Sequence, residues 1–289
     1  MDRKQFIQKG LATAGTLATT AALGNVLSAK EQIATENVGF NHLPNTKSTI
    51  MNNSVLHKAA TRGEANHGWL KSHHTFSFAN YYNPDRMHFG VLRVLNDDAV
   101  DGGKGFDRHP HDNMEIISIP LEGSLEHKDS MGNVAVIKNG DVQVMSAGTG
   151  VFHSEYNEDK AGLVKFLQIW VYPNKKNVQP RYDQITLNLE DRHNKLQQIL
   201  SPNADDAGVW IHQNAWFHLG KFDAGVTANY TFKAKGNGLY VFNLKGDIQI
   251  NEQILNTRDG YGIWDVDNVA IKANTDAEFL LMEVPMELK

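Results

Sequence analysis

The hydrophobic residues of this chain fall in short runs separated by turn residues. Residues 88–95 form one such run and are followed by Asn96, Asp97 and Asp98. Runs of this length, regularly spaced between clusters of Gly, Asn and Asp, indicate β-strands joined by tight turns. Further runs occupy residues 123–127, 133–137, 142–145 and 163–172. The pattern predicts an all-β barrel or sandwich, with the last and most apolar run crossing its core.

A break in this pattern separates two strand-rich blocks. Residues 173–180 are polar and end in a proline, which is typical of a domain junction. Residues 189–200 carry apolar side chains near helical spacing and predict one short helix. Strand-like runs then resume from residue 208 to residue 284. We therefore place a first domain at residues 54–175, a linker with a short helix at 176–206, and a second domain at 207–289.

Histidines and acidic residues cluster on two of the predicted strands. Alternate side chains of a strand share a face, so His109 points the same way as His111, and His153 the same way as Glu155. Imidazole nitrogens and one carboxylate oxygen form a ligand set that Fe(II), Mn(II), Ni(II), Cu(II) or Zn(II) accepts, and an octahedral ion keeps two open positions. Open positions are typical of catalysis or sensing. The two strands together predict a metal site.

The residues around these histidines resemble the two motifs of the cupins, small β-barrels with a metal at the mouth. The first motif spans residues 103–123, and the second spans residues 148–157, with Gly148 where proline is usual. Three stretches resemble one cupin family, the pirins, and specifically their bacterial quercetinase-like branch. They are GWLKSHHTFSF at 68–78, FDRHPH at 106–111 and AGTGVFHSE at 147–155. The resemblance extends from about Ser54 to the C-terminus.

The resemblance implies a bicupin, two tandem jelly-roll β-barrels. Residues 239–248 resemble the strand and glycine turn that follow Glu115, and residues 259–266 fall where a second metal motif would lie. The sequence has no histidine after His218. We therefore expect the second domain to be a metal-free cupin barrel that closes or shapes the first.

Two glutamates compete for the fourth ligand position. Glu115 has the parity of His109 and His111, which predicts that it faces the same cavity. In ordinary cupins the glutamate of the first motif is a ligand, whereas in pirins the glutamate of the His-Ser-Glu run takes that place. The resemblance therefore implies His109, His111, His153 and Glu155 as metal ligands. It leaves Glu115 as a structural carboxylate or one that orients a ligand imidazole.

For function, the resemblance implies a metal-dependent dioxygenase that cleaves flavonols such as quercetin with dioxygen. Glu155 would bind the metal and also accept the proton of the flavonol 3-hydroxyl as catalytic base. Fe(II) is the expected ion, with Zn, Ni, Cu or Mn as alternatives, because ligand type alone does not separate them. Two other interpretations stay open. One is a metal-dependent regulator or redox sensor that binds a partner protein, and the other is a cupin enzyme for another enolic or catecholic small molecule.

The N-terminal residues have the character of an export signal. Residues 1–29 combine a charged start, a mildly apolar middle and small residues at the end. Arg3 and Lys4 resemble a twin-arginine signal with lysine in the second position. This predicts a periplasmic or exported protein, with an uncleaved arm on a cytoplasmic protein as the alternative. The polar residues 30–53 are expected to be a linker.

Composition and net charge limit the classes of binding partner and of chemistry that this chain can have. A chain of 289 residues with 41% hydrophobic and 21% charged residues is ordinary for a soluble globular protein. The formal net charge of −5 argues against nucleic acid as a partner, because binding to phosphates requires a basic face. The absence of cysteine excludes disulfides, thiolate metal sites and a cysteine nucleophile. We expect a monomer without membrane attachment once the signal is removed.

Overall fold

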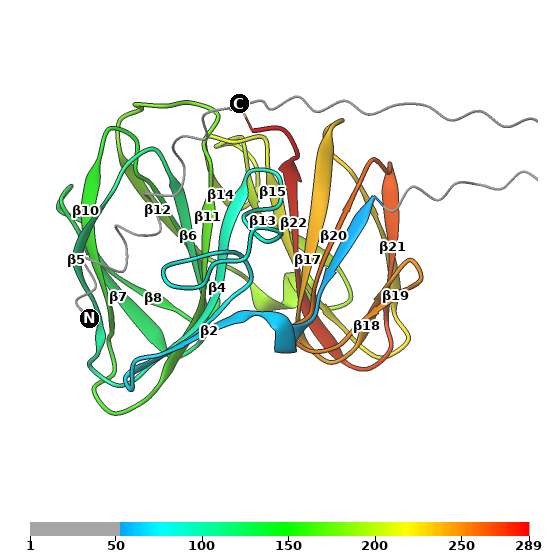
Figure 1. Ribbon diagram of the computed structural model, residues 1–289, viewed down its shortest axis with the longest axis horizontal. Coiled ribbons are helices and arrows are strands. Elements are labelled where there is room, and N and C mark those ends of the chain that lie inside the picture. Colours follow the sequence, from blue (N-terminus) through cyan, green and yellow to red (C-terminus); the bar gives the residue numbers. More distant parts are fainter. Residues whose placement is uncertain (1–52, 289) are drawn as a thin grey trace, which may run out of the picture.

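The computed structural model describes residues 53–288, and they form two β-barrels side by side (Figure 1). The all-β bicupin architecture expected from the sequence is confirmed. The predicted export signal at residues 1–29 and residues 30–52 of the predicted linker lie outside the described residues. Within the described part of the chain, no helix is long and apolar enough to cross a membrane.

The N-terminal barrel consists of a seven-stranded and a four-stranded sheet. In spatial order, the larger sheet contains β12 (Arg181–Thr186), β9 (Asp141–Ser146), β6 (Glu115–Glu122), β11 (Val164–Val171), β4 (Leu92–Val100), β3 (Leu70–His74) and β2 (Gly63–Asn66). The smaller sheet contains β5 (Gly105–His111), β10 (Val151–Asn157), β7 (Ser124–Asp129) and β8 (Val134–Lys138). The apolar strand β11 lies at the centre of the larger sheet, as its composition predicts.

The C-terminal barrel repeats this arrangement. Its larger sheet contains β1 (Ser54–His57), β20 (Gly260–Trp264), β17 (Asn237–Lys245), β22 (Ala277–Pro285), β15 (Trp216–Phe222), β13 (Leu196–Ser201) and β14 (Val209–Trp210). Its smaller sheet contains β16 (Thr227–Thr231), β21 (Asn268–Ala273), β18 (Ile248–Ile250) and β19 (Gln253–Leu255). The central strands of the larger sheets and all strands of the smaller sheets follow the same order in both barrels, which fits a duplicated barrel.

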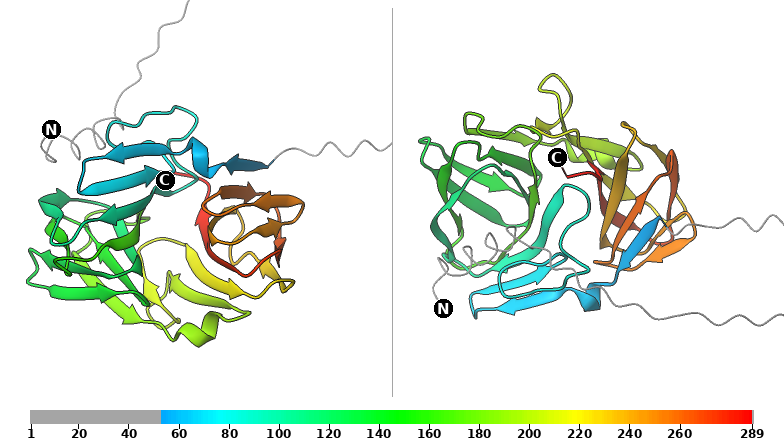
Figure 2. Two further views of the ribbon diagram at one scale, coloured as in Figure 1. Left: turned by 90° about the horizontal axis from the view of Figure 1, so that it is seen from below. Right: turned by 45° about the horizontal axis from the view of Figure 1, so that its top comes forward.

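The main hydrophobic core lies between the two larger sheets rather than inside either barrel. Ile117 and Ile169 of the N-terminal barrel belong to the same buried cluster as Phe217 and Leu280 of the C-terminal barrel. Separate clusters fill the two barrel interiors. Burial of apolar area at about 25 cal/mol per Å² makes this shared core the main force that holds the barrels together. Figure 2 shows them packed against each other along these sheets.

Three local expectations differ from the structure. Strand β1 pairs with β20, so residues 54–57 belong to the C-terminal sheet and not to the first domain. The predicted linker at 176–206 supplies β12 to one sheet and β13 to the other. The predicted helix is a single 3₁₀ turn, η3 (Leu189–Arg192), and most of the remaining apolar residues form β13. Spacing alone does not distinguish a short helix from a buried strand. A second 3₁₀ turn is η2 (Ala59–Thr61).

Candidate metal centre

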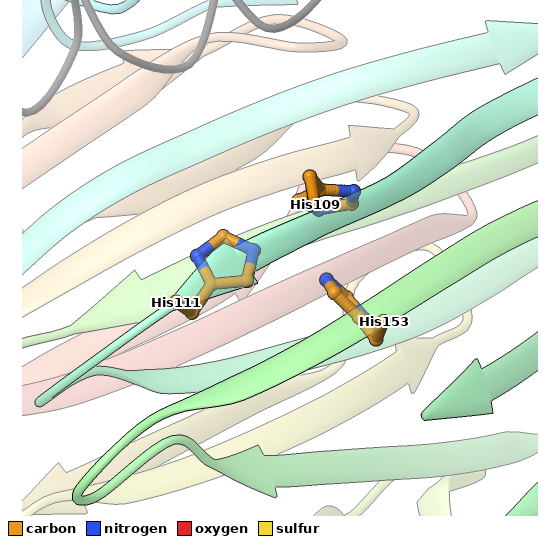
Figure 3. Close-up of side chains that lie close together, drawn as sticks. All are labelled: His109, His111 and His153. Atoms are coloured by element: carbon orange, nitrogen blue, oxygen red, sulfur yellow. The ribbon is translucent and has the colours of Figure 1, made fainter. Parts of the chain in front are cut away.

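Strands β5 and β10 position the three histidines. The two strands are antiparallel neighbours, and His153 lies directly opposite His109. Alternation along β5 turns His109 and His111 to the barrel interior, while Pro110 between them is exposed. All three histidines are buried. Figure 3 shows His109 and His111 on one strand and His153 on the next, with the imidazoles turned toward one another.

The three imidazoles form a compact triangle. Their ring centroids are 4.9 Å apart for His109 and His111, 4.4 Å for His109 and His153, and 4.9 Å for His111 and His153. One nitrogen of each ring lies within 4.8 Å of one nitrogen of each of the others. Neutral imidazoles at this separation can share one divalent ion, so the donor set fits a metal. The Nδ1 of His109 lies 2.7 Å from the carbonyl oxygen of Asp107, which leaves its Nε2 for the ion.

Glu155 borders this triangle. Its side chain is buried, and Oε2 lies 4.0 Å from Nε2 of His153. The amide of Gln168 donates to Oε1 at 3.0 Å and to Oε2 at 3.2 Å, and the Ser118 hydroxyl donates to Oε1 at 3.3 Å. These donors fix the carboxylate beside the histidines, where it can contribute to holding a divalent cation. The arrangement places all four predicted ligands together, and their role as ligands stays a prediction.

Glu115 does not face this cavity, so the expectation from parity is wrong. Its carboxylate accepts a 2.6 Å hydrogen bond from the Ser146 hydroxyl. It lies on the same face of β6 as Ile117 and Ile119, which belong to the core between the barrels. Ser118, which contacts Glu155, is on the other face. The turn between β5 and β6 contains Asn113 with φ of 44°, and it resets the alternation.

The burial of Glu115 makes the stability of the protein depend on pH. Burial raises the pKa of Glu115 from 4.5 to about 7, and the Ser146 hydrogen bond, Arg181 and the His212 backbone oppose this only in part. The free energy of unfolding is therefore highest below about pH 4.5, where Glu115 is protonated in both the folded and the unfolded state. It falls as the pH rises through about 7, because the unfolded chain then releases the Glu115 proton more readily than the folded chain. Relative to Glu115→Gln, the natural protein should lose on the order of 3 kcal/mol of unfolding free energy between about pH 4 and 8. Urea unfolding at both pH values measures this, and parallel curves for the two proteins would contradict it.

Sequence reasoning missed a fourth histidine at the site. His127 on β7 is buried, and its Nδ1 lies 3.5 Å from Nδ1 of His153. Its Nε2 lies 3.1 Å from Oδ2 of Asp129. Strand β7 pairs with β10, and His127 lies opposite Glu155 in that register. Alternation along β7 does not tell which of its two faces points into the barrel. The pairing of β7 with β10 brings His127 to the site.

A small cavity opens beside the histidines. Its volume is about 20 Å³, room for little more than one ordered water. Three buried polar atoms on its lining residues have no hydrogen-bond partner in the described part of the chain: Asn96 Oδ1, Gln168 Oε1 and Trp170 Nε1. The Trp170 indole also contacts the His111 ring edge-on at 5.0 Å. The remaining lining residues are Leu70, Ser72, Phe78, Asp98, Phe106, His109, His111 and Glu155.

Two fused cupin barrels, with converging histidines in the first, make this chain a bicupin with a candidate divalent-metal centre. The family follows from comparison with known proteins. Residues 55–171 match the family model Pirin, and residues 198–284 match the model described as quercetinase C-terminal cupin domain. The chain belongs to the pirin family, in its bacterial quercetin 2,3-dioxygenase-like branch.

Relatives agree over most of the chain. A protein named quercetin 2,3-dioxygenase from Escherichia coli K12 is 42% identical over 230 residues, which is 80% of this chain and 98% of that protein. A pirin-like protein from Caulobacter vibrioides is 39% identical over 222 residues, 76% of this chain and 95% of that protein. The crystal structure of the bacterial pirin YhhW from E. coli in complex with nickel(II) is 41% identical with a TM-score of 0.76. The structural match covers 80% of this chain and 99% of the YhhW chain.

Proposed function

We propose that this protein is a metal-dependent dioxygenase that cleaves flavonols such as quercetin, with Fe(II) as the working ion. The observation that carries the proposal is the triangle of buried imidazoles beside the buried Glu155 carboxylate. The name of its E. coli relative supports the reaction type, and the nickel(II) complex of YhhW supports a divalent ion in a pirin. A bound ion would supply Lewis acidity and, as iron, a relay for electrons from the substrate to dioxygen.

The residues of the chain then have separable roles. His109, His111, His153 and Glu155 would hold the ion, and Glu155 would also take the proton of the flavonol 3-hydroxyl at Oε2. Gln168 and Ser118 keep that carboxylate in place through their hydrogen bonds.

The cavity lining complements a polyphenol. The unpartnered Gln168 Oε1 and Asn96 Oδ1 can accept hydrogen bonds from phenolic hydroxyls, and Trp170 Nε1 can donate one. An aromatic wall beside a few unpaired polar atoms is typical of a small-molecule site. Phe78 lines this wall and packs edge-on against Trp170 at a centroid distance of 5.4 Å. Because the cavity is much smaller than a flavonol, Phe78 and its neighbours must move outward to admit the substrate.

The small cavity favours a second candidate substrate. A single-ring catechol needs less displacement of the wall than a flavonol does, and it offers the same phenolic hydroxyls to Asn96 and Gln168. The second candidate function is therefore oxygenation of a smaller catecholic or enolic molecule at the same centre.

The test compares both substrates on one sample. Protein purified without oxygen and loaded with Fe(II) is mixed in air with quercetin or with catechol, and substrate loss and released carbon monoxide are measured. We expect quercetin to be consumed with release of carbon monoxide. Turnover of catechol alone would replace the proposal with the second candidate. If the iron-loaded protein consumes neither, both proposals fail, and the metal-dependent regulator or redox sensor remains as the interpretation.

A further inference from the structure

A chain of polar contacts runs from a buried carboxylate to one metal-site histidine. Oδ2 of Asp129 lies 3.1 Å from Nε2 of His127, and Nδ1 of His127 lies 3.5 Å from Nδ1 of His153. The side chains of His127 and Asp129 are fully buried, so water does not compete for these contacts. The ring of Tyr182 lies on His127 with a centroid distance of 4.8 Å and an interplanar angle of 37°. His127 is thus held between Asp129 and His153.

The hydrogen-bond donors around Asp129 fix the direction of the chain. Its Oδ1 accepts from the backbone N–H groups of Met131 at 2.9 Å and Asn133 at 3.1 Å, and its Oδ2 accepts from the Asn133 amide at 2.8 Å. Both carboxylate oxygens are engaged as acceptors by these N–H groups, so Asp129 also acts as an acceptor toward His127. His127 must therefore carry its proton on Nε2, which makes its Nδ1 an acceptor. His153 must then donate from Nδ1, which leaves the lone pair of its Nε2 for a cation.

We infer that Asp129 and His127 are positioning residues that set the tautomer of His153 for metal binding. The inference concerns how the metal centre is built. It rests on metal binding by the histidines and not on flavonol cleavage, so failure of the quercetin assay would leave it standing.

The replacement Asp129→Asn reverses this direction. The backbone donors of Met131 and Asn133 require an oxygen at the Oδ1 position, so the new amide nitrogen takes the place of Oδ2, and the Asn133 side-chain amide turns its oxygen toward it. That nitrogen donates to His127 Nε2, and the proton of His127 moves to Nδ1 and faces His153. His153 must then accept at Nδ1 and keep its proton on Nε2, where it blocks the cation. The replacement His127→Phe only removes the contact and leaves either tautomer of His153 open.

The test measures Ni(II) affinity by titration calorimetry in the two single variants and the double variant. Loss of a residue that orients a ligand costs 10- to 100-fold in metal affinity. We expect about 10-fold for His127→Phe and about 100-fold for Asp129→Asn. The double variant should return to about 10-fold, because without His127 the amide no longer acts on His153. A greater loss in His127→Phe than in Asp129→Asn, or additive losses in the double variant, would overturn the inference.

A second readout does not depend on metal or on the variants. In the metal-free natural protein, nitrogen-15 NMR of the histidine side chains reports which ring nitrogen carries the proton. The inference requires protonated Nδ1 on His153 and protonated Nε2 on His127. The opposite tautomer on either ring would refute it even if a variant failed to fold.

A different observation concerns the seam between the barrels. A cavity of about 230 Å³ lies there, with apolar walls from both barrels and from the segment that links them. Arg192 Nε and Arg258 Nη1 are buried atoms of its lining residues, and neither has a hydrogen-bond partner among residues 53–288. Its lining residues are Ile119, Pro120, Leu121, Asn139, Gly140, Asp141, Leu187, Arg192, Leu219, Gly220, Leu244, Lys245, Arg258 and Glu278.

The acidic groups at this cavity have other partners or an opposing charge nearby. Asp141 accepts hydrogen bonds from the Lys138 backbone, the Gln184 amide and the Thr186 hydroxyl. Glu278 on β22 lies opposite Lys245 of β17 in the sheet register. The Arg258 Nε pairs with Asp97 at 3.2 Å, but Asp97 also pairs with Arg62 at 3.3 Å, so one carboxylate serves two guanidinium groups. Two guanidinium donors of the seam, Arg192 Nε and Arg258 Nη1, are therefore left without a partner in the described part of the chain.

The geometry points to a binding site in this seam for a small carboxylate with an apolar body. Guanidinium groups bind carboxylates through charge-assisted hydrogen bonds. The aliphatic side chains of Leu187, Leu219 and Leu244 offer contact to the rest of such a ligand. Pockets at domain interfaces are common ligand sites, and this volume suits a molecule of about one ring. A ligand there would contact both barrels.

Benzoate is the probe, and benzamide is its neutral control of the same shape. In calorimetry with the metal-loaded protein, we expect benzoate to bind at least about tenfold more tightly than benzamide, a difference of about 1.4 kcal/mol. Arg192→Gln should weaken benzoate about tenfold. Arg86→Gln removes the same charge from a guanidinium that contacts Thr61 away from the seam, and it should have no effect. Binding should also persist in His109→Ala, which excludes the metal centre as the site.

Three outcomes would refute this site. They are equal affinity for benzoate and benzamide, equal loss in the Arg192 and Arg86 variants, and loss of benzoate binding in His109→Ala.

Discussion

Replacing His109 by alanine should abolish metal binding. His109 supplies one corner of the imidazole triangle, with its ring 4.4 Å from that of His153 and 4.9 Å from that of His111. Without it, the cation keeps two imidazoles and one carboxylate, and the affinity should fall by more than about 100-fold, beyond the loss expected for a residue that only orients a ligand. Elemental analysis after dialysis should find about one ion per natural chain and only traces in the variant.

The control for this prediction is His193→Ala. His193 is exposed and pairs with Asp223 at 3.0 Å, so it reports the effect of losing a histidine outside the metal centre. It should keep a full complement of metal. An equal metal content in His109→Ala and the natural protein would show that the triangle is not the site.

The second large effect separates the two glutamates. Glu155→Gln should lower metal affinity at least about tenfold and quercetin turnover by a factor of about 10² to 10⁴, because the carboxylate is lost both as a ligand and as a base. Glu115→Gln should change neither, because the side chain faces the core between the barrels and bonds to Ser146. The two variants carry the same glutamate-to-glutamine replacement at two buried positions, so each is the control for the other. Equal metal loss from both, or loss only from Glu115→Gln, would overturn the assignment.

The centre was predictable where it depends on alternation within one strand. His109 and His111 share a face of β5, and His153 and Glu155 both point inward from β10, as expected. The alternation did not carry from His111 to Glu115, because the turn at Asn113 lies between two strands of different sheets. Sequence parity therefore holds only as far as a strand is continuous.

The features that the sequence did not predict depend on contacts between residues that are distant in the chain. His127 belongs to the site because β7 pairs with β10, and nothing in its local sequence shows that pairing. Strand β1 joins the sheet of the second barrel by pairing with β20, some two hundred residues away in sequence. Residues 196–201 pack as strand β13 against β15, although their spacing also suits a helix. In these cases, tertiary contacts override local preference.

We propose that the histidine and glutamate centre catalyses dioxygenation of a flavonol. The most direct test of this claim is a reaction of the iron-loaded protein with quercetin under ¹⁸O₂, with mass spectrometry of the products. A flavonol dioxygenase should place both atoms of dioxygen in the depside product and release unlabelled carbon monoxide, whose oxygen comes from the 3-hydroxyl. Unchanged quercetin, or a product without label, from protein that carries a full complement of iron would contradict the claim.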